Sequence, residues 1–256
     1  GAGAGGGTGE GAPVLVQLDQ LTVSDGLALR NFAGNFNTAG GFNGTFTGLF
    51  NGKAGVAGAV SPSDGRTAVR IRSEDAGAVL RAGPFLEGAL GGTLDLTLVP
   101  ANAAGSFDGT LALRGLRVRD APAIAELLDA ISVVGLLQQL DGQGLAFDTV
   151  DADFRLTPQQ IIVTESSAVG PGLGISLDGI YTLASRAVDF QGVISPFYIL
   201  NGIGSLLTRR GEGLLGFNFT LRGTPGAPQV GVNPLSIFTP GMFRDIFRRP
   251  PPVVTN

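Results

Sequence analysis

Apolar and polar residues alternate one by one through most of the middle of this chain. Leu94, Leu96 and Leu98 are separated from one another by Asp or Thr. The same period of two recurs in five later segments, whose apolar positions are Phe107, Leu111 and Leu113; Ala152, Phe154 and Leu156; Leu173, Ile175 and Leu177; Val188, Phe190 and Ile194; and Leu215, Phe217, Phe219 and Leu221. Successive side chains of a strand point to opposite faces, so each segment is expected to form a strand with one apolar and one hydrated face. This pattern is typical of an antiparallel sheet.

Four earlier segments also have the character of strands, and they span residues 14–23, 27–32, 42–50 and 67–72. The glycine content favours the same class, because 42 of the 256 residues are Gly and Gly disfavours helix interiors by about 1 kcal/mol relative to Ala. The chain is nevertheless 43% hydrophobic with a mean hydropathy of +0.29, so it can bury a core.

Helical spacing appears in three places. The longest runs from Ala121 to Leu140, where Asp120 is expected to cap the helix, Pro122 is tolerated in its first turn and Asp141 with the following glycine ends it. Two shorter helices are expected from Phe197 to Arg210 and from Pro240 to Arg249.

The predicted fold class is therefore mainly β: a curved antiparallel sheet, forming an open groove or half-barrel, with two or three short helices packed on it. Residues 1–12 are interpreted as a Gly/Ala-rich linker, residues 13–249 as one domain, and residues 250–256 as a Pro-rich tail. The chain starts without a methionine, and we interpret it as a part of a longer or processed protein whose targeting segment lies upstream.

The composition argues against enzymatic chemistry. The chain has no His, Cys or Trp, so it offers no imidazole base, no thiol nucleophile and no thiolate or imidazole ligand for zinc. We expect no catalytic residue, no metal and no cofactor. Asp151 and Asp153 share one strand face and resemble an acid/base or metal pair, but the alternation of a hydrated face explains them more simply. Asp64, Glu74, Asp75 and Glu87 are interpreted as loop charges, and Ser166, Ser195 and Ser205 lack a base. The net charge of −4 argues against a nucleic-acid partner.

Several segments together resemble the C-terminal region of AsmA-like proteins, in particular the long YhdP-related envelope members. The resemblance covers about residues 75–247, and it rests on the order of these pieces: Asp120-Ala-Pro-Ala-Ile-Ala-Glu-Leu-Leu128, Gly142-Gln-Gly-Leu-Ala-Phe147, Gly170-Pro-Gly-Leu-Gly-Ile-Ser-Leu-Asp-Gly179, Val188-Asp-Phe-Gln-Gly192, Ile194-Ser-Pro-Phe-Tyr-Ile-Leu-Asn201, Leu221-Arg-Gly-Thr224, and Asn233-Pro-Leu-Ser-Ile-Phe-Thr-Pro-Gly-Met-Phe-Arg-Asp-Ile-Phe247. The family's membrane anchor and most of its repeating groove are absent from this chain.

The resemblance implies a protein that binds or guides phospholipid acyl chains along an apolar β-groove between envelope membranes. It implies a periplasmic location in a Gram-negative bacterium, tethered to the inner membrane by an upstream segment, with phospholipid and envelope or outer-membrane proteins as partners. The expected lipid-binding residues are Leu94, Leu96, Leu98, Leu111, Leu113, Leu173, Ile175, Leu177, Phe190, Phe217, Phe219 and Leu221. The expected membrane-docking residues, on the terminal helix, are Phe243, Arg244, Ile246, Phe247, Arg248 and Arg249.

The alternation alone leaves other interpretations open. An apolar sheet face is more often an ordinary core than an open groove, and the helix from Ala121 to Leu140 is a natural lid for such a core. The chain is then a structural scaffold of the envelope that does not touch lipid, or a piece of a secreted β-solenoid. An outer-membrane barrel is disfavoured by the presence of only two Tyr and no Trp.

Overall fold

The structure is a computed structural model that describes residues 13–24, 26–38, 40–83, 86–132, 134–196, 216–233, 236 and 250–252. The predicted linker at 1–12 and the two helices expected at 197–210 and 240–249 lie outside the described residues, as do the six expected membrane-docking residues.

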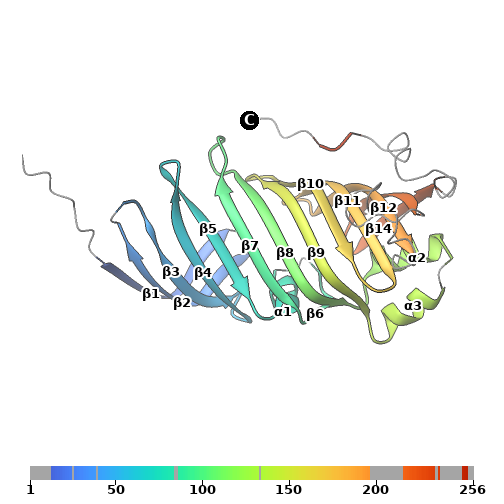
Figure 1. Cartoon of the computed structure of the whole chain (residues 1–256), viewed down its shortest axis with the longest axis horizontal. Coiled ribbons are helices and arrows are strands. Elements are labelled where there is room, and N and C mark those ends of the chain that lie inside the picture. Colours follow the sequence, from blue (N-terminus) through green and yellow to red (C-terminus); the bar gives the residue numbers. More distant parts are fainter. Residues whose placement is uncertain are drawn as a thin grey trace, which may run out of the picture.

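A single antiparallel sheet of fourteen strands makes up most of the described chain, and it is curved and does not close on itself (Figure 1). Thirteen strands follow one another in the sheet in the order of the sequence, and the short β6 pairs only with β8. The strands are β1 (Pro13–Ser24), β2 (Leu27–Asn37), β3 (Asn43–Phe50), β4 (Ala54–Ser63), β5 (Arg66–Ser73), β6 (Ala89–Leu90), β7 (Thr93–Pro100), β8 (Phe107–Val118), β9 (Leu145–Leu156), β10 (Gln160–Val169), β11 (Leu173–Thr182), β12 (Ala187–Pro196), β13 (Phe217–Thr224) and β14 (Ala227–Asn233). The predicted fold class is confirmed.

The connections differ between the two borders of the sheet that are formed by the ends of the strands. Short turns join the strands at one edge, for example residues 64–65 between β4 and β5 and residues 225–226 between β13 and β14. The described helices are inserted at the opposite edge. They are α1 (Ala76–Ala82) between β5 and β6, and α2 (Pro122–Ala130) and α3 (Val134–Asp141) between β8 and β9. We call these two borders, which run along the strand ends, the turn edge and the helix edge; they are distinct from the edge strands β1 and β14.

The prediction of one helix from Ala121 to Leu140 is wrong in its continuity, because the chain forms two helices there. Ser132 adopts a left-handed φ of +59° between α2 and α3, which a continuous helix does not allow. Asp120 does not cap α2: it has a φ of +48°, and the capping position is taken by Ala121 without a side-chain hydrogen bond. Pro122 does lie in the first turn, and α3 does end at Asp141.

Helix α1 was not predicted, and Asp75 is not a mere loop charge. Its carboxylate oxygen accepts a hydrogen bond of 2.9 Å from the backbone N–H of Ala78 and so caps the first turn of α1. Strands β4, β6, β10 and β14 are likewise additions to the predicted set.

The apolar side chains lie on the inner face of the curve, where the helices pack. The main buried cluster joins this face to the helices through Leu127 and Leu128 of α2 and Leu140 of α3. Helix α2 contacts β14, α3 contacts β9, and the two helices contact each other. Because five strand steps separate β9 from β14 in the sheet, the curl of the sheet is what lets one helix pair touch both strands (Figure 1).

A second buried cluster fills the inner face near the amino terminus without a helix of its own. Phenylalanine side chains dominate it, with ring centroids of Phe32 and Phe46 5.5 Å apart and those of Phe32 and Phe36 6.3 Å apart. Val79 of α1 touches both clusters and joins them.

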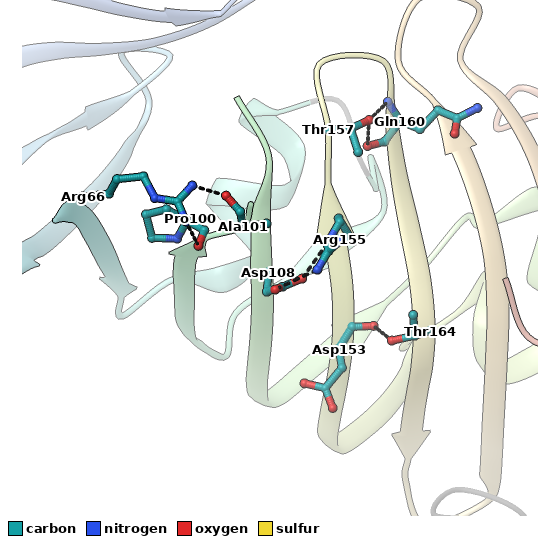
Figure 2. Close-up of polar contacts among 9 residues, drawn as sticks. All are labelled: Arg66, Pro100, Ala101, Asp108, Asp153, Arg155, Thr157, Gln160 and Thr164. Atoms are coloured by element: carbon teal, nitrogen blue, oxygen red, sulfur yellow. Dashed lines mark hydrogen bonds and ion pairs between the residues drawn. The ribbon is translucent and has the colours of Figure 1, made fainter. Parts of the chain in front are cut away.

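Cross-strand ion pairs characterise the outer face. Arg155 makes a two-pronged contact with Asp108 on the neighbouring strand, at 2.7 and 3.0 Å (Figure 2). Arg114 reaches Asp151 at 2.7 Å, and Arg70 and Arg72 both bind Asp95. Pairs of opposite charge on adjacent strands fix the register on the hydrated face.

Inner-face glycines lie under phenylalanine rings of the adjacent strand. A Cβ added to Gly58 would lie 2.2 Å from the ring of Phe46, and one added to Gly109 would lie 2.2 Å from the ring of Phe154. A Cβ added to Gly55, on the same strand as Gly58, would have no neighbouring atom within 4 Å.

The Gly58→Ala substitution is therefore expected to destabilise the protein by about 1–3 kcal/mol through overpacking. Gly55→Ala on the same strand is the matched control and is expected to leave the melting temperature unchanged or slightly raised. Thermal unfolding followed by circular dichroism measures both, and Phe46→Leu should restore part of the stability of Gly58→Ala. Equal melting temperatures for the two alanine variants would contradict this packing role.

The Asp95 carboxylate predicts a dependence of stability on pH. Hydrogen bonds from Arg70, and then from Arg72, lower the pKa of Asp95 below its ordinary value. A group whose pKa is lowered by folding stabilises the native state above its unfolded pKa, and this contribution disappears as the pH falls through the folded pKa. Asp95→Asn is thus expected to lower the melting temperature at pH 7, with the gap between variant and parent closing in strong acid. A gap of constant size across the acidic range would contradict the ion pair as its cause.

Candidate functional site: an apolar strip on the inner face

Part of the inner apolar face is left outside both buried clusters. The residues concerned are apolar, belong to β7 through β12 and are partly exposed: Leu98, Phe107, Phe154, Leu156, Ile161, Val163, Tyr181, Val188 and Phe190. We call this set the apolar strip. It lies toward the turn edge, whereas the most buried residues of the same strands lie toward the helix edge, for example Leu113, Leu173 and Ile194.

The pairing register makes the apolar strip continuous. One row of directly paired residues crosses it as Leu98, Gly109, Phe154, Val163, Gly179 and Phe190. A second row is formed by the next inward-facing pairs toward the turn edge. It runs through Phe107, Leu156, Ile161, Tyr181 and Val188. Neither row contains a charged side chain.

The first row extends far beyond the strip. Its pairings continue through Val69, Val60, Gly44, Phe36 and Val14 on one side and through Leu221 and Val230 on the other. Every member on thirteen strands is therefore apolar or glycine. At a strand spacing of about 4.8 Å, such a row is about 55–60 Å long.

The phenylalanine rings of the strip pack against glycines on the neighbouring strands. The rings of Phe154 and Phe190 lie against Gly109 and Gly179 on the neighbouring strands, so closely that a Cβ at either glycine would fall within 2.5 Å of the ring. Each ring therefore rests over the backbone of its neighbour. This pairing keeps a large apolar area on the face while limiting how far it projects.

Helices cover the rows next to the helix edge. Ile194 is 0% exposed, and Leu113 and Leu173 are 3% and 2% exposed. The row toward the turn edge has no such cover from α1, α2 or α3, since those helices leave and re-join the sheet at the helix edge. Among the described residues, the inner face is thus divided into a helix-covered core and a partly exposed strip.

Polar contacts hold the turn edge beside the strip. Arg66 donates to the backbone carbonyl oxygens of Pro100 and Ala101 and so ties the turn after β7 to β5 (Figure 2). Thr157 closes the turn between β9 and β10, where its hydroxyl accepts from the backbone N–H of Gln160 at 2.9 Å. These contacts keep the strip's border in place without placing a charge on the strip itself.

The twelve expected lipid-binding residues all lie on the inner face, but they divide between core and strip. Five are buried under the helices, namely Leu94, Leu113, Leu173, Ile175 and Phe219. Five others are partly exposed and pack against that core, namely Leu96, Leu111, Leu177, Phe217 and Leu221. Leu98 and Phe190 belong to the strip. The other strip residues belong to the same alternating pattern, apart from those on β10, which was not among the predicted strands.

The polar candidates form no reactive constellation in the described residues. Asp151 is engaged by Arg114, and Asp153 is exposed beside Thr164, whose hydroxyl donates to the Asp153 backbone carbonyl (Figure 2). Ser166 donates to the carbonyl oxygen of Leu177 at 2.7 Å, and Ser195 is fully buried. Across the described ranges, no group of three or more acidic, His or Cys side chains is placed to hold a metal ion.

A buried polar cluster lies on the other face of β11, β12 and β13. The Asp178 carboxylate is 2% exposed and accepts a hydrogen bond of 2.9 Å from the amide of Gln191, which is 5% exposed. Ser236 accepts from the backbone N–H of Asn218 at 2.8 Å. These contacts give this part of the outer face a covered, polar character.

The chain has no match among protein-family models, curated proteins or solved structures. None of the helices in the described ranges is long and apolar enough to cross a membrane.

The division between core and strip predicts different responses to the same substitution. Ile194→Asp buries an unpaired charge in the core and is expected to cost several kcal/mol and to prevent folding. Ile161→Asp places its charge on the partly exposed strip, where water can reach it, and is expected to give a folded protein with a moderately lower melting temperature. Circular dichroism and solubility report both outcomes. Loss of folding in both variants would mean that the strip is core as well.

Proposed function

We propose that the apolar strip binds lipid acyl chains and that the protein is part of an AsmA-like lipid carrier of a bacterial envelope. The observation that carries the proposal is the continuous, uncharged and partly exposed apolar strip on the inner face of a sheet that does not close. The order of the sequence pieces that resemble AsmA-like proteins supports the same proposal.

The physical basis of binding is the transfer of methylene groups from water to the strip. Each CH₂ sheltered in this way contributes about 0.8 kcal/mol. The strip presents no charged group to a headgroup, so the headgroup remains in water beyond the turn edge. Binding is then governed by chain length and is nearly independent of headgroup charge.

A uniform row also favours movement along the sheet. The row offers apolar or glycine positions on every one of thirteen strands, so an acyl chain that moves along it meets no charged side chain. The proposed carrier holds phospholipid chains against this face and lets them pass along it between envelope membranes. Its proposed location is the periplasm, with envelope or outer-membrane proteins as further partners.

Adjacent residues of β7 supply a matched test of lipid binding. Leu98 lies on the strip, whereas the next residue, Val99, is 39% exposed on the outer face, where it pairs with Asp108. The combined variant Leu98→Gln with Ile161→Gln is expected to weaken binding of a fluorescent long-chain fatty acid about tenfold, since it removes apolar contact worth about 1.4 kcal/mol or more. Val99→Gln is expected to have no effect.

Native mass spectrometry of the purified protein should also show copurified phospholipid. Binding should be similar for lipids with zwitterionic and anionic headgroups and should change little with salt. A protein that carries no lipid and does not bind the fatty acid is a structural module, and the proposal is then wrong. Equal affinities of the Leu98/Ile161 and Val99 variants would place binding elsewhere.

A further inference from the structure

The two edge strands of the sheet, β1 and β14, differ in how they are protected against pairing with another strand. Unpaired N–H and C=O groups on an edge strand form a template for a further strand, and proteins usually block it with proline, charge or a covering helix. At one edge, β14 contains Pro228, which lacks an N–H, and α2 packs against β14. At the other edge, β1 has twelve residues, its only proline is the first residue, and its only charged side chain is Asp19.

Apolar side chains remain exposed along β1. On the inner side, Val14 pairs with Phe36 and Leu18 pairs with Phe32, yet they are 43% and 42% exposed. On the outer side, Leu15 is 78% exposed. No described strand pairs with the far side of β1. The apolar rows of the inner face therefore run to this edge, and no described strand continues them beyond β1.

The face pattern of β1 changes phase at its centre. Leu18 and Leu21 pair with Phe32 and Leu29, two buried residues of the same cluster, so both point inward although three positions separate them. The shift coincides with Asn31 on β2, which has a left-handed φ of +50°. Asp19 and Gln20 occupy the two positions between the inward leucines.

This shift makes β1 complementary to itself in one antiparallel register. Residues that lie directly opposite in an antiparallel pair point to the same face. With a two-fold axis between Asp19 and Gln20, Leu18 of each copy lies opposite Leu21 of the other on the inner face, and Gln17 lies opposite Thr22 on the outer face. An axis through Asp19 would instead place Gln17, which points outward, opposite Leu21, which points inward.

We propose that two copies of the protein associate through antiparallel pairing of their β1 strands about this axis. The paired strands satisfy each other's free backbone groups and cover Leu18 and Leu21. The inner faces of the two sheets then join into one continuous apolar surface, with a helix-covered core in each copy. The proposal does not depend on lipid binding, because it concerns only the β1 edge.

Sedimentation velocity over a wide range of protein concentration tests the association. We expect a monomer–dimer equilibrium, and Leu18→Lys is expected to weaken it about tenfold or more, because it removes both Leu18–Leu21 pairs. Val99→Lys, also on an exposed apolar position but on β7, is the control and should leave the equilibrium unchanged. Circular dichroism checks that each variant is folded.

Cross-linking tests the register and does not rely on a destabilising variant. The chain has no cysteine, so every thiol cross-link comes from an introduced residue. In Gln17→Cys combined with Thr22→Cys, each thiol faces its partner on the other copy, and a covalent dimer is expected under oxidation or with a short thiol-specific linker. In Gln17→Cys alone, the two thiols lie five positions apart, on the order of 17 Å, and no cross-link is expected.

A protein that is monomeric at every concentration would overturn the proposal, and that result would leave the acyl-chain proposal untouched. A dimer that Leu18→Lys does not weaken, or a cross-link in Gln17→Cys alone, would also overturn it, because either result places the contact at another surface or in another register. Loss of fatty-acid binding with the dimer intact would count only against the function proposed for the strip.

Discussion

The structure depends on a cross-strand register that carries one kind of residue across the whole sheet, although bulges interrupt the pairing of β1, β2 and β10. A strand that slips by one residue exchanges its inner and outer faces. The alternation within each strand therefore produces one apolar face of the sheet only if neighbouring strands stay in register. Here the inner row passes from Val14 to Val230 with apolar or glycine residues at every step. The outer face reinforces the same register with ion pairs such as Arg155–Asp108. A slip of one strand would interrupt the apolar row on the inner face and separate the ion pairs on the outer face.

Glycine has a defined place within this register. Antiparallel strands bring directly opposite Cβ atoms to within about 4.5–5.5 Å, and two large side chains compete for that space. A phenylalanine opposite a glycine resolves the competition, since the ring lies over the backbone of its partner, as at Phe154 and Gly109. The high glycine content is thus partly a property of the apolar face and not only of turns. It also explains how a face rich in phenylalanine remains smooth.

The sequence predicted on which face of the sheet a side chain lies better than it predicted whether that side chain is buried. Alternation is a local property, so the strands around Leu96, Phe154 and Phe219 and their apolar sides could be identified from spacing alone. Strand β4 was missed because its inward positions are small or widely spaced in a run of Gly and Ala. The break between α2 and α3 depends on the conformation of Ser132, which no spacing rule reports. Whether an inward residue such as Leu113 or Leu98 is covered depends on where the helices lie, and that is decided by which edge of the sheet they connect.

The placement of all described helices at one edge has a consequence for binding. A sheet covered evenly by helices would bury its whole inner face and leave only a core. Here α2 and α3 span from β9 to β14 near the helix edge, and the rows beyond them remain partly exposed. The core stabilises the curl, and the curl in turn holds the partly exposed strip in a concave arrangement. Stability and the proposed binding surface therefore belong to the same strands but to different rows, which lets residues of the strip change without loss of the fold.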